Sequence, residues 1–486
     1  MTESIKAPRP VQAVNLLRTG HRQEAIDLLR AEMAEGPAAG ERYRSIAMLA
    51  GRIGEVDMML EASRRFARTQ PEDLGRLLQY WGDLAANGQS AAARAAAEQW
   101  EAHNRPNPWV DHALGTMASA EGDFDKARER YRSALATGGD AAQNWFALAM
   151  ITTFRDGADI DAMRAAQQRI SQSDTQARAR LHYAVAKGLH DLSDFDGAWA
   201  AYRAGAKLRS GSEPYSGQQL ENLVASLIAD FDAAQMGDLR APAFQDVDVV
   251  MVNGLPRSGS TLIEQILTRH SQVPDGGESN LFRAASLPTV NFSLKGARAY
   301  QERHGEEADP WGLVAQTYAR IMRERFPQTG TLVDKTLLQS HLMGLILHAL
   351  PQVPIVWMRR DPLGNAVSCF RTYFTTRMAW SWSPEDIAHF FRQEDALFAH
   401  WTDLAGDRIL VVPYEGVVDQ PRLWIEKIAA HCNLPFEPAM LESHLGERSI
   451  STASVSQVRQ PINRAGIGVH RHYPQFVDRF ESSYRR

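Results

Sequence analysis

The sequence predicts an all-α repeat array followed by an α/β domain whose parallel sheet is covered by helices. Three observations predict this arrangement. Glycines recur every 34 residues through the first quarter of the chain. From Val247 onward, short apolar runs alternate with segments of helical periodicity. The first apolar run leads through a glycine-containing loop into a helix, which is how an α/β unit begins.

Size and composition indicate a soluble globular protein with several domains. A chain of 486 residues is too long for a single hydrophobic core. The formal net charge of −5 gives no reason to expect nucleic acid as a partner. Only Cys369 and Cys432 occur, which fits a reducing compartment, and no segment resembles a signal peptide or a membrane span. We therefore expect a cytoplasmic protein that binds neither nucleic acid nor membrane.

Residues 1–208 are predicted to form the helical array. The recurring glycines are Gly20, Gly54, Gly88 and Gly122. In the clearest unit, 109–139, Gly115 falls on the first helix and Tyr131 on the second. This spacing resembles tetratricopeptide repeats, in which two antiparallel helices meet at small residues. The resemblance implies a groove for a peptide or protein. The alternatives are an array that only braces the second domain and a non-repeating alanine-rich bundle.

A polar, turn-rich run from Arg209 to Pro214 marks the end of the array. The chain then divides into an array at 1–208, a linker with a connecting helix at 209–245, and the α/β domain at 246–486. Apolar residues at helical spacing from Leu220 to Phe231 predict that the connecting helix packs against the second domain.

Three further strand–helix units follow the first one. Strands are predicted at 331–334, 354–358 and 408–412, and helices at 337–350, after Asp361-Pro362, and at 421–431. Asp361 is expected to cap its helix, with proline at the first helical position. Repeated units of this kind imply a parallel sheet with helices on both faces, and ligands of such sheets bind beyond the carboxyl ends of the strands.

The loop after the first strand is a candidate anion site, because free N–H groups at the start of a helix favour an anion. Its spacing, Gly254-x-x-x-x-Gly259, is nearly that of a nucleotide-binding P-loop. Ser260 stands where that loop has its lysine, which argues against ATP or GTP hydrolysis. Arg257 supplies a cation within the loop instead.

Cations gather at the predicted strand ends, which carry Arg257, Lys335, Arg359, Arg360 and also Tyr414. Four like charges at one sheet edge repel one another unless an anion lies among them. We therefore expect a highly phosphorylated or sulfated ligand.

These residues resemble the sulfotransferase family, and most closely its tyrosylprotein sulfotransferase branch, over about 245–475. The run 256–262 resembles the loop that binds the 5′-phosphosulfate of 3′-phosphoadenosine-5′-phosphosulfate (PAPS). The run 355–362, with Ser368 beyond it, resembles the element that holds the 3′-phosphate. An array ahead of such a domain is also similar to bacterial tetratricopeptide sulfotransferases. The resemblance implies a sulfotransferase fold and PAPS-dependent transfer, without a metal, to a hydroxyl group such as that of a protein or peptide tyrosine.

The resemblance assigns roles residue by residue. Arg257 would contact the 5′-phosphate and the transferring group, beside the N–H groups of Ser258, Gly259, Ser260, Thr261 and Leu262. Glu278 falls where the branch places its catalytic base, Lys335 where a lysine neutralises the leaving oxygen, and Ser454 near that oxygen. The nucleotide would be held by Arg360, Ser368, Tyr414 and Arg459.

Several points stay open at this stage. His270 competes with Glu278 as the base, because cytosolic members of the family use histidine. Asn280 stands where animal tyrosylprotein sulfotransferases have an arginine that reads acidic residues, although Arg283 is near. The alternative functions are an interaction scaffold with a degenerate catalytic domain and a P-loop kinase or NTPase. The acceptor, the partner of the repeats and the oligomeric state, with a homodimer as one option, are undetermined.

Overall fold

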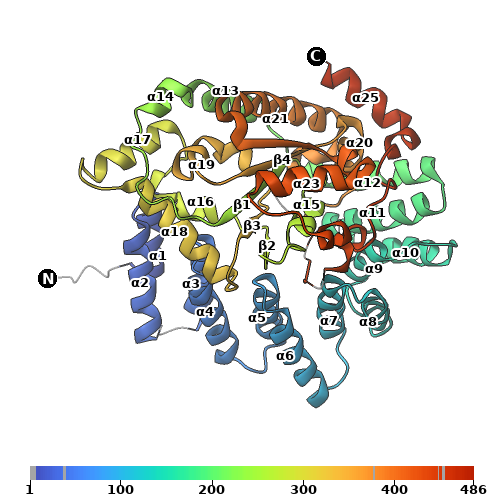
Figure 1. Cartoon of the computed structure of the whole chain (residues 1–486). Coiled ribbons are helices and arrows are strands. Elements are labelled where there is room, and N and C mark those ends of the chain that lie inside the picture. Colours follow the sequence, from blue (N-terminus) through green and yellow to red (C-terminus); the bar gives the residue numbers. More distant parts are fainter. Residues whose placement is uncertain are drawn as a thin grey trace.

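The computed structural model describes residues 7–36, 40–375, 378–446, 448–450, 452 and 455–485. A helical array leads into an α/β part built on a five-stranded parallel sheet (Figure 1). This confirms the predicted fold class. Within the described residues, no helix is both long and apolar enough to span a bilayer.

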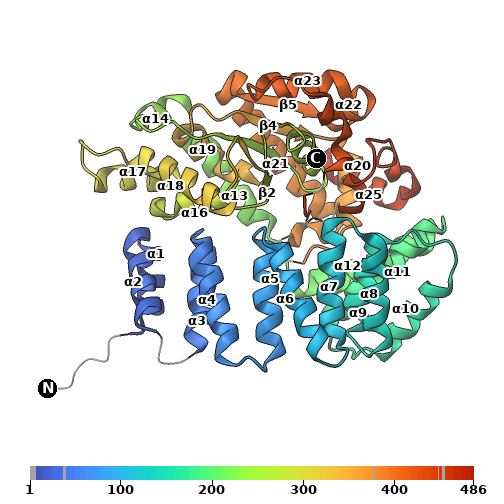
Figure 2. The same ribbon diagram turned by 60° about the horizontal axis from the view of Figure 1, so that its bottom comes forward.

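The helices of the array follow one another in pairs, side by side along the α/β part (Figure 2). The pairs are α1 (Arg9–Arg18) and α2 (Arg22–Glu35), α3 (Glu41–Arg52) and α4 (Val56–Thr69), α5 (Leu74–Ala86) and α6 (Ser90–His103), α7 (Pro108–Glu121) and α8 (Phe124–Ala136), α9 (Ala141–Ile151) and α10 (Ala158–Arg169), and α11 (Thr175–Asp191) and α12 (Phe195–Ser212). The repeating glycines lie in the turns inside the first four pairs, with φ of 83°, 78°, 83° and 91° at Gly20, Gly54, Gly88 and Gly122. Glycine adopts this left-handed conformation at little cost, so the 34-residue spacing is the spacing of these turns.

Helix α12 continues to Ser212, past the predicted end of the array at residue 208. Arg209 explains the difference, because its buried side chain pairs with Glu213 at 2.7 Å and its guanidinium lies 5.3 Å from the centre of the Trp382 ring. These contacts hold the polar run in a helix. The next helices are α13 (Gly217–Asp230), which matches the predicted connecting helix, and the short α14 (Ala233–Gly237).

The sheet has the order β2–β3–β1–β4–β5, with every neighbouring pair parallel. Its strands are β1 (Val249–Gly254), β2 (Gly276–Gly277), β3 (Leu332–Asp334), β4 (Ile355–Arg359) and β5 (Ile409–Pro413). The central strand β1 is buried along its whole length, as its unbroken apolar run predicts. The loop that follows β1 therefore leaves the middle of the sheet.

Alternate residues of the strands face two different helical layers. Met251 and Trp357 pack with α13, α18 (Pro310–Arg325), α19 (Met343–Ala349) and α21 (Pro384–Ala405). Val252 and Met358 face α15 (Ser260–Leu267) and α23 (Pro421–His431). The remaining helices are α16 (Leu281–Ala285), α17 (Leu294–Arg303), α20 (Pro362–Phe370), α22 (Tyr414–Asp419), α24 (Val455–Val458) and α25 (Pro474–Tyr484).

The helix predicted at 337–350 forms only from Met343, after a 3₁₀ turn at Gln339–Leu342. Leu338 has a φ of 59°, and this left-handed residue prevents an earlier helical start. Asp361 caps α20 as predicted, since its carboxylate accepts the N–H of Gly364 at 2.7 Å.

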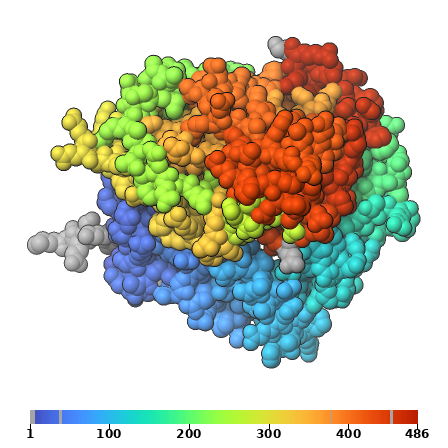
Figure 3. Space-filling model, viewed as in Figure 1, coloured from blue at the N-terminus to red at the C-terminus, as the bar shows by residue number. Residues whose placement is uncertain are grey.

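The turns inside the first four helix pairs lie next to residues of the α/β part. The array and this part pack against each other (Figure 3). Arginines of the α/β part donate to carbonyl oxygens near these turns. The bonds are Arg303 to Thr19 at 2.9 Å, Arg325 to Ala86 at 2.8 Å and Arg459 to Ala120 at 3.3 Å. Carbonyl groups at the end of a helix carry partial negative charge, which favours a cation there. The array is therefore held against the α/β part by these contacts.

Replacing Glu55 by glutamine should lower the free energy of unfolding by about 3 kcal/mol. Glu55 is 5% exposed and accepts hydrogen bonds from Arg22 of the array at 2.9 Å and from Arg320 of α18 at 2.7 Å. Losing the carboxylate leaves the buried Arg22 cation without its counter-charge. Denaturant unfolding measures this loss. Glu24→Gln, at an exposed position of α2, is the control, and equal stability of both variants would contradict the prediction.

Candidate active site

The loop between β1 and α15 forms a narrow cradle of N–H groups. Arg257 has a φ of 66° and Gly259 a φ of 106°, and this backbone turns three amides, those of Gly259, Ser260 and Thr261, away from any acceptor in the described chain. A Cβ at position 259 would lie 2.7 Å from Cδ2 of Tyr414, so glycine is required there.

The cradle has fewer donors than the five that we predicted. The amides of Ser258 and Leu262 are engaged within the loop, donating to the carbonyls of Leu255 at 3.1 Å and Gly259 at 2.9 Å. Ser258 is 2% exposed and is not among the residues that line the cavity described next. These two residues shape the loop, while the three amides between them can meet an anion.

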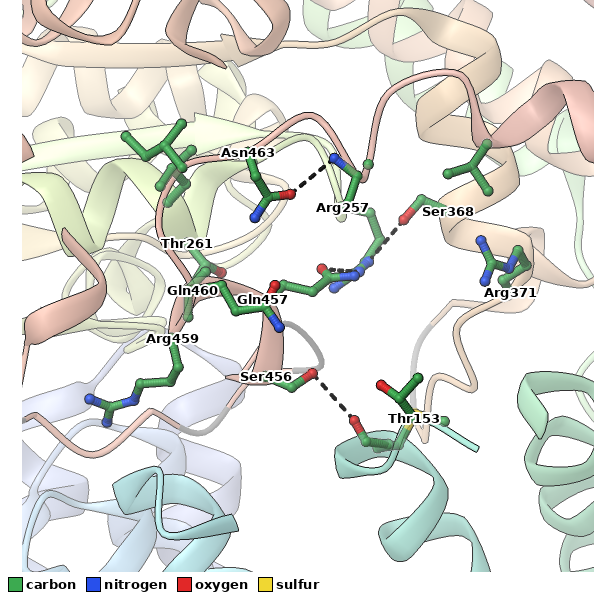
Figure 4. Close-up of a pocket in the computed structure, with 18 of the residues that line it drawn as sticks. Thr153, Arg257, Thr261, Ser368, Arg371, Ser456, Gln457, Arg459, Gln460 and Asn463 are labelled. Atoms are coloured by element: carbon green, nitrogen blue, oxygen red, sulfur yellow. Dashed lines mark hydrogen bonds between the residues drawn. The ribbon is translucent and has the colours of Figure 1, made fainter. Parts of the chain in front are cut away.

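A cavity of about 780 Å³ lies beside the cradle (Figure 4). Among the described residues, its lining carries one carboxylate, Asp191, and six cationic side chains: Arg128, Lys187, Arg257, Arg360, Arg371 and Arg459. In a chain whose net charge is −5, this local excess of positive charge indicates a polyanionic ligand. Gly259, Ser260, Thr261, Leu262, Ser368 and Tyr414 also line the cavity, so it unites most of the predicted nucleotide contacts.

Arg257 connects the cradle to the opposite wall of the cavity. Its Nε donates to Ser368 Oγ at 3.1 Å and its Nη2 to Gln457 Oε1 at 2.7 Å (Figure 4). Burial, reinforced by the nearby cations of Arg360 and Arg371, lowers the pKa of Arg257 to about 10. This cation is therefore costly in the protein, and an anion among the three arginines would relieve the cost.

Arg359 and Arg360 point in different directions, although Arg359 ends β4 and Arg360 directly follows it. Arg360 donates from Nη1 to the carbonyl of Arg257 at 2.9 Å, and its guanidinium lies 4.7 Å from the centre of the Tyr414 ring. Its Nε is buried and has no acceptor within the described chain. Arg359 instead pairs with Asp395 at 2.6 Å, away from the cavity. The expected convergence of the strand-end cations thus holds for Arg360 and fails for Arg359.

Glu278 and Lys335 meet at the end of two neighbouring strands. Gly277 pairs with Asp334 in the sheet, so the residues that follow them are level with each other. Lys335 Nζ donates to Glu278 Oε1 at 2.5 Å and lies 3.4 Å from Glu264 Oε2 of α15. The lysine is 1% exposed, whereas the Glu278 side chain is 40% exposed.

The pair of Glu278 and Lys335 lies outside the residues that line the cavity. The carboxylates of Glu278 and Glu264 attract the ammonium group of Lys335 to the β2–β3 side of the cradle. The positions of the strand ends in the sequence did not predict this placement. The exposed carboxylate of Glu278 is accessible to an acceptor from this side.

Two other predicted residues are placed differently. Arg459 lines the cavity, but its guanidinium donates to the carbonyls of Arg448 and Gly446, and Figure 4 shows it turned toward the array. His270 is 2% exposed, and its ring bonds to backbone groups of Gln272 at 3.0 Å and Pro435 at 2.8 Å. Such an enclosed histidine cannot reach an acceptor, so Glu278 is the better candidate for the base.

Ser454 lies outside the described residues, so its predicted role stays a prediction. Within the described residues, no three His, Cys, Asp or Glu side chains are grouped as metal ligands would be. The expectation of a metal-independent reaction also stays a prediction.

Sequence reasoning missed Gln457, Arg371 and the contribution of the array. Gln457 is in the run that the family resemblance covers, and Arg371 is three residues beyond Ser368, one helical turn away. That spacing could have indicated Arg371. The array residues that line the cavity carry no such signal, because only the packing of distant segments brings them there.

These features describe a class of protein: an α/β domain that has a loop suited to an anion at the end of its central strand and a cationic cavity beside that loop. Residues 249–438 match the model of the sulfotransferase family. The matched residues lie within the α/β part, which is therefore similar to the sulfotransferase family.

Relatives of the chain are distant. It is 26% identical to an uncharacterised protein of Aquifex aeolicus over 317 residues, 62% of this chain and 41% of the relative. It is 22% identical to a protein-tyrosine sulfotransferase of Drosophila melanogaster over 40% of each chain, and 22% identical to protein-tyrosine sulfotransferase 1 of Danio rerio over 51% of this chain and 72% of the relative. The chain thus spans about two fifths of the length of the first two relatives.

Two solved structures are also similar. The sulfotransferase domain of the olefin synthase from Synechococcus PCC 7002 is 18% identical, with 50% of this chain and 98% of the other covered and a TM-score of 0.34. A sulfotransferase from Mycobacterium avium is 13% identical, with 68% and 97% covered and a TM-score of 0.27.

Proposed function

We propose that this protein transfers the sulfuryl group of PAPS to a hydroxyl acceptor. The observation that carries the proposal is the cavity beside the β1–α15 loop, whose lining, in the part of the chain that the structure describes, has six cationic side chains and one carboxylate. PAPS is an anion with phosphate at one end and phosphosulfate at the other, and a cavity of this charge and shape suits it. The family match of residues 249–438 supports the same reaction.

The residues that would hold the donor divide into two groups. Arg257 and the amides of Gly259, Ser260 and Thr261 would bind the phosphosulfate end, where the helix start favours negative charge. Arg360 and Ser368 would bind the 3′-phosphate, and the buried Nε of Arg360 offers a donor without an acceptor in the described chain. Tyr414 would pack beside them, since its ring contacts both Arg360 and the loop glycine.

The donor supplies an activated sulfuryl group whose bond to the bridging oxygen breaks as the acceptor oxygen attacks the sulfur. Glu278 would accept the acceptor's proton, and Lys335 would neutralise negative charge on the bridging oxygen. Adenosine 3′,5′-bisphosphate then leaves. Such transfers depend mainly on positioning and on cations placed where charge develops. Ser454 would assist Lys335 at the same oxygen.

A protein or peptide tyrosine is the acceptor that we favour. Two relatives are named protein-tyrosine sulfotransferases, at 22% identity, and the paired helices of the array resemble a tetratricopeptide domain that would recruit a protein. A cytoplasmic location is part of this proposal. Asn280 stands where the animal enzymes have an arginine that recognises acidic residues. In this chain Arg283 would recognise negative charge on the acceptor. The guanidinium of Arg283 lies 4.5 Å from the centre of the Phe292 ring.

Competition between nucleotides tests the proposed donor. Adenosine 3′,5′-bisphosphate should displace a labelled nucleotide from the protein at a concentration at least about tenfold lower than ATP requires. Its 3′-phosphate would form a charge-assisted hydrogen bond at Arg360 and Ser368, which ATP lacks the group to form. Stronger binding of ATP with Mg²⁺ would favour a kinase or NTPase instead. Binding of neither nucleotide would favour an interaction scaffold.

Adjacent arginines provide a matched pair of variants. Arg360→Met should weaken binding of adenosine 3′,5′-bisphosphate by about tenfold, since it removes a cation from the cavity wall. Arg359→Met removes an equal charge one residue away, where the side chain pairs with Asp395, and should bind the nucleotide as the unchanged protein does. Isothermal titration calorimetry measures both, and equal losses would contradict the assignment of Arg360.

A further inference from the structure

One wall of the cavity belongs to the helical array rather than to the α/β part. Its lining residues from the array include Arg128 of α8, Thr152 and Thr153 after α9, and Lys187, His190 and Asp191 of α11. In Figure 4, Thr153 lies on the array side, across the open space from Arg257 and Ser368. The cavity is therefore closed by two parts of the chain that are far apart in sequence.

Lys187 is one of the two cationic side chains that the array contributes to the described lining. Its Nζ donates to the carbonyl of Thr152 at 2.7 Å and to the carboxylate of Asp191, which also accepts the amide of Phe154 at 3.0 Å. An ammonium group has three protons. Within the described chain these two bonds leave one proton without a hydrogen-bond acceptor, and the centre of the Phe154 ring lies 5.6 Å from Nζ.

Arg371 joins this wall to the predicted 3′-phosphate contacts. It follows Ser368 by one helical turn, and its guanidinium lies 5.9 Å from the Tyr202 ring of the array and 5.6 Å from the Tyr473 ring. Its Nε is buried without an acceptor in the described chain. Its charge is close enough to Lys187 to help lower the pKa of that lysine, behind the larger effect of burial.

The array also contacts residues 456–463, which line the cavity. Ser456 donates from Oγ to the carbonyl of Met150 at 3.3 Å, beside the Gln457 that contacts Arg257 (Figure 4). Burial lowers the pKa of His190 to about 3, so this lining residue stays neutral and its Nδ1 is bonded to Tyr473 Oη at 2.7 Å. Positive charge on the array wall thus comes from Arg128 and Lys187.

We propose that the helical array is part of the donor site, with Lys187 as a contact for the 3′-phosphate of the nucleotide and Thr153 as part of the wall. This proposal rests on the proposed function, because it assigns the array to a nucleotide that the α/β part would bind. It gives the array a role in donor binding that does not depend on recruiting a protein.

Two substitutions in the full chain test the proposal. Lys187→Met removes the charge, with the exposed Lys207→Met of α12 as its control. Thr153→Trp fills the cavity from an exposed position of the array, with the exposed Thr137→Trp as its control. Calorimetric titrations with adenosine 3′,5′-bisphosphate and with adenosine 5′-phosphate, which lacks the 3′-phosphate, separate a contact to that phosphate from a general loss.

We expect Lys187→Met to weaken binding of the bisphosphate about tenfold and to leave binding of adenosine 5′-phosphate within about twofold. Thr153→Trp should weaken binding of both nucleotides by at least about tenfold, and the two controls should bind as the unchanged protein does. If Lys187→Met lowers the melting temperature, Thr153→Trp tests whether the array is part of the donor site. Thr153 is exposed, so this substitution should not disturb the fold.

Unchanged binding by Thr153→Trp, or equal losses of both nucleotides in a stably folded Lys187→Met, would overturn the role of the array. Failure of the unchanged protein to bind the bisphosphate would instead overturn the proposed function, and the two failures are thus distinguishable.

Discussion

Replacing Glu278 by glutamine is expected to lower the rate of sulfuryl transfer by about 10²–10⁴-fold. A phenolic hydroxyl has a pKa of about 10, so attack at neutral pH needs a group that accepts its proton. Glutamine keeps the size of the side chain but cannot accept that proton. Transfer of labelled sulfate to an acceptor, with saturating donor, measures the rate.

Binding of the nucleotide distinguishes a catalytic role from a structural one. Glu278 lies outside the cavity lining, so the glutamine variant should bind adenosine 3′,5′-bisphosphate as well as the unchanged protein does. Lys335 keeps Glu264 as a partner at 3.4 Å, which protects the fold. Glu306→Gln, at an exposed position, serves as the control. Near-full transfer by Glu278→Gln would exclude Glu278 as the base.

Replacing Arg257 by methionine should weaken binding of adenosine 3′,5′-bisphosphate by about 100-fold. This arginine provides the loop's own cation, and it links the cradle to Ser368 and Gln457. The same change should leave the melting temperature of the protein without nucleotide equal or higher, because burial beside Arg360 and Arg371 disfavours the charged form of Arg257.

A loss of affinity combined with unchanged or greater stability is the signature of a residue kept for binding. Calorimetric titration and thermal unfolding of the same preparation measure the two quantities. Arg323→Met, at an exposed position of α18, is the control for loss of one arginine. Binding within threefold of the unchanged protein would contradict the role of the loop.

The architecture could be predicted wherever local sequence decides it. The apolar run of β1, the Asp361 cap and the glycine turns of the array all lie where we expected them. The prediction failed at Arg209, where ring and ion-pair contacts from other segments extend α12. It also failed at Leu338, where a left-handed residue delays α19. These differences arise from contacts and backbone conformations that no local pattern encodes.

The site was predictable to the extent that strand ends determine it. Arg257, Arg360, Ser368 and Tyr414 line one cavity, and their roles in binding a nucleotide stay a prediction. The directions of the side chains at the strand ends were not predictable. Arg359 pairs with Asp395, although it is next to Arg360 in the sequence. The pairing of Lys335 with Glu278 follows from the β2–β3 register. This register could not be predicted, because β2 has only two residues and leaves no strand pattern in the sequence. The array wall depends wholly on long-range packing.

Transfer of labelled sulfate from PAPS to panels of peptides, sugars and phenols tests the central claim most directly. We expect at least one hydroxyl acceptor, with tyrosine peptides foremost, to become labelled while adenosine 3′,5′-bisphosphate is released in equal amount. Glu278→Gln should slow the labelling by about 10²–10⁴-fold, and Arg257→Met should reduce it strongly at donor concentrations that do not saturate the variant. Absence of transfer to every acceptor by a protein that binds the bisphosphate, or transfer of phosphate from ATP under the same conditions, would contradict the account.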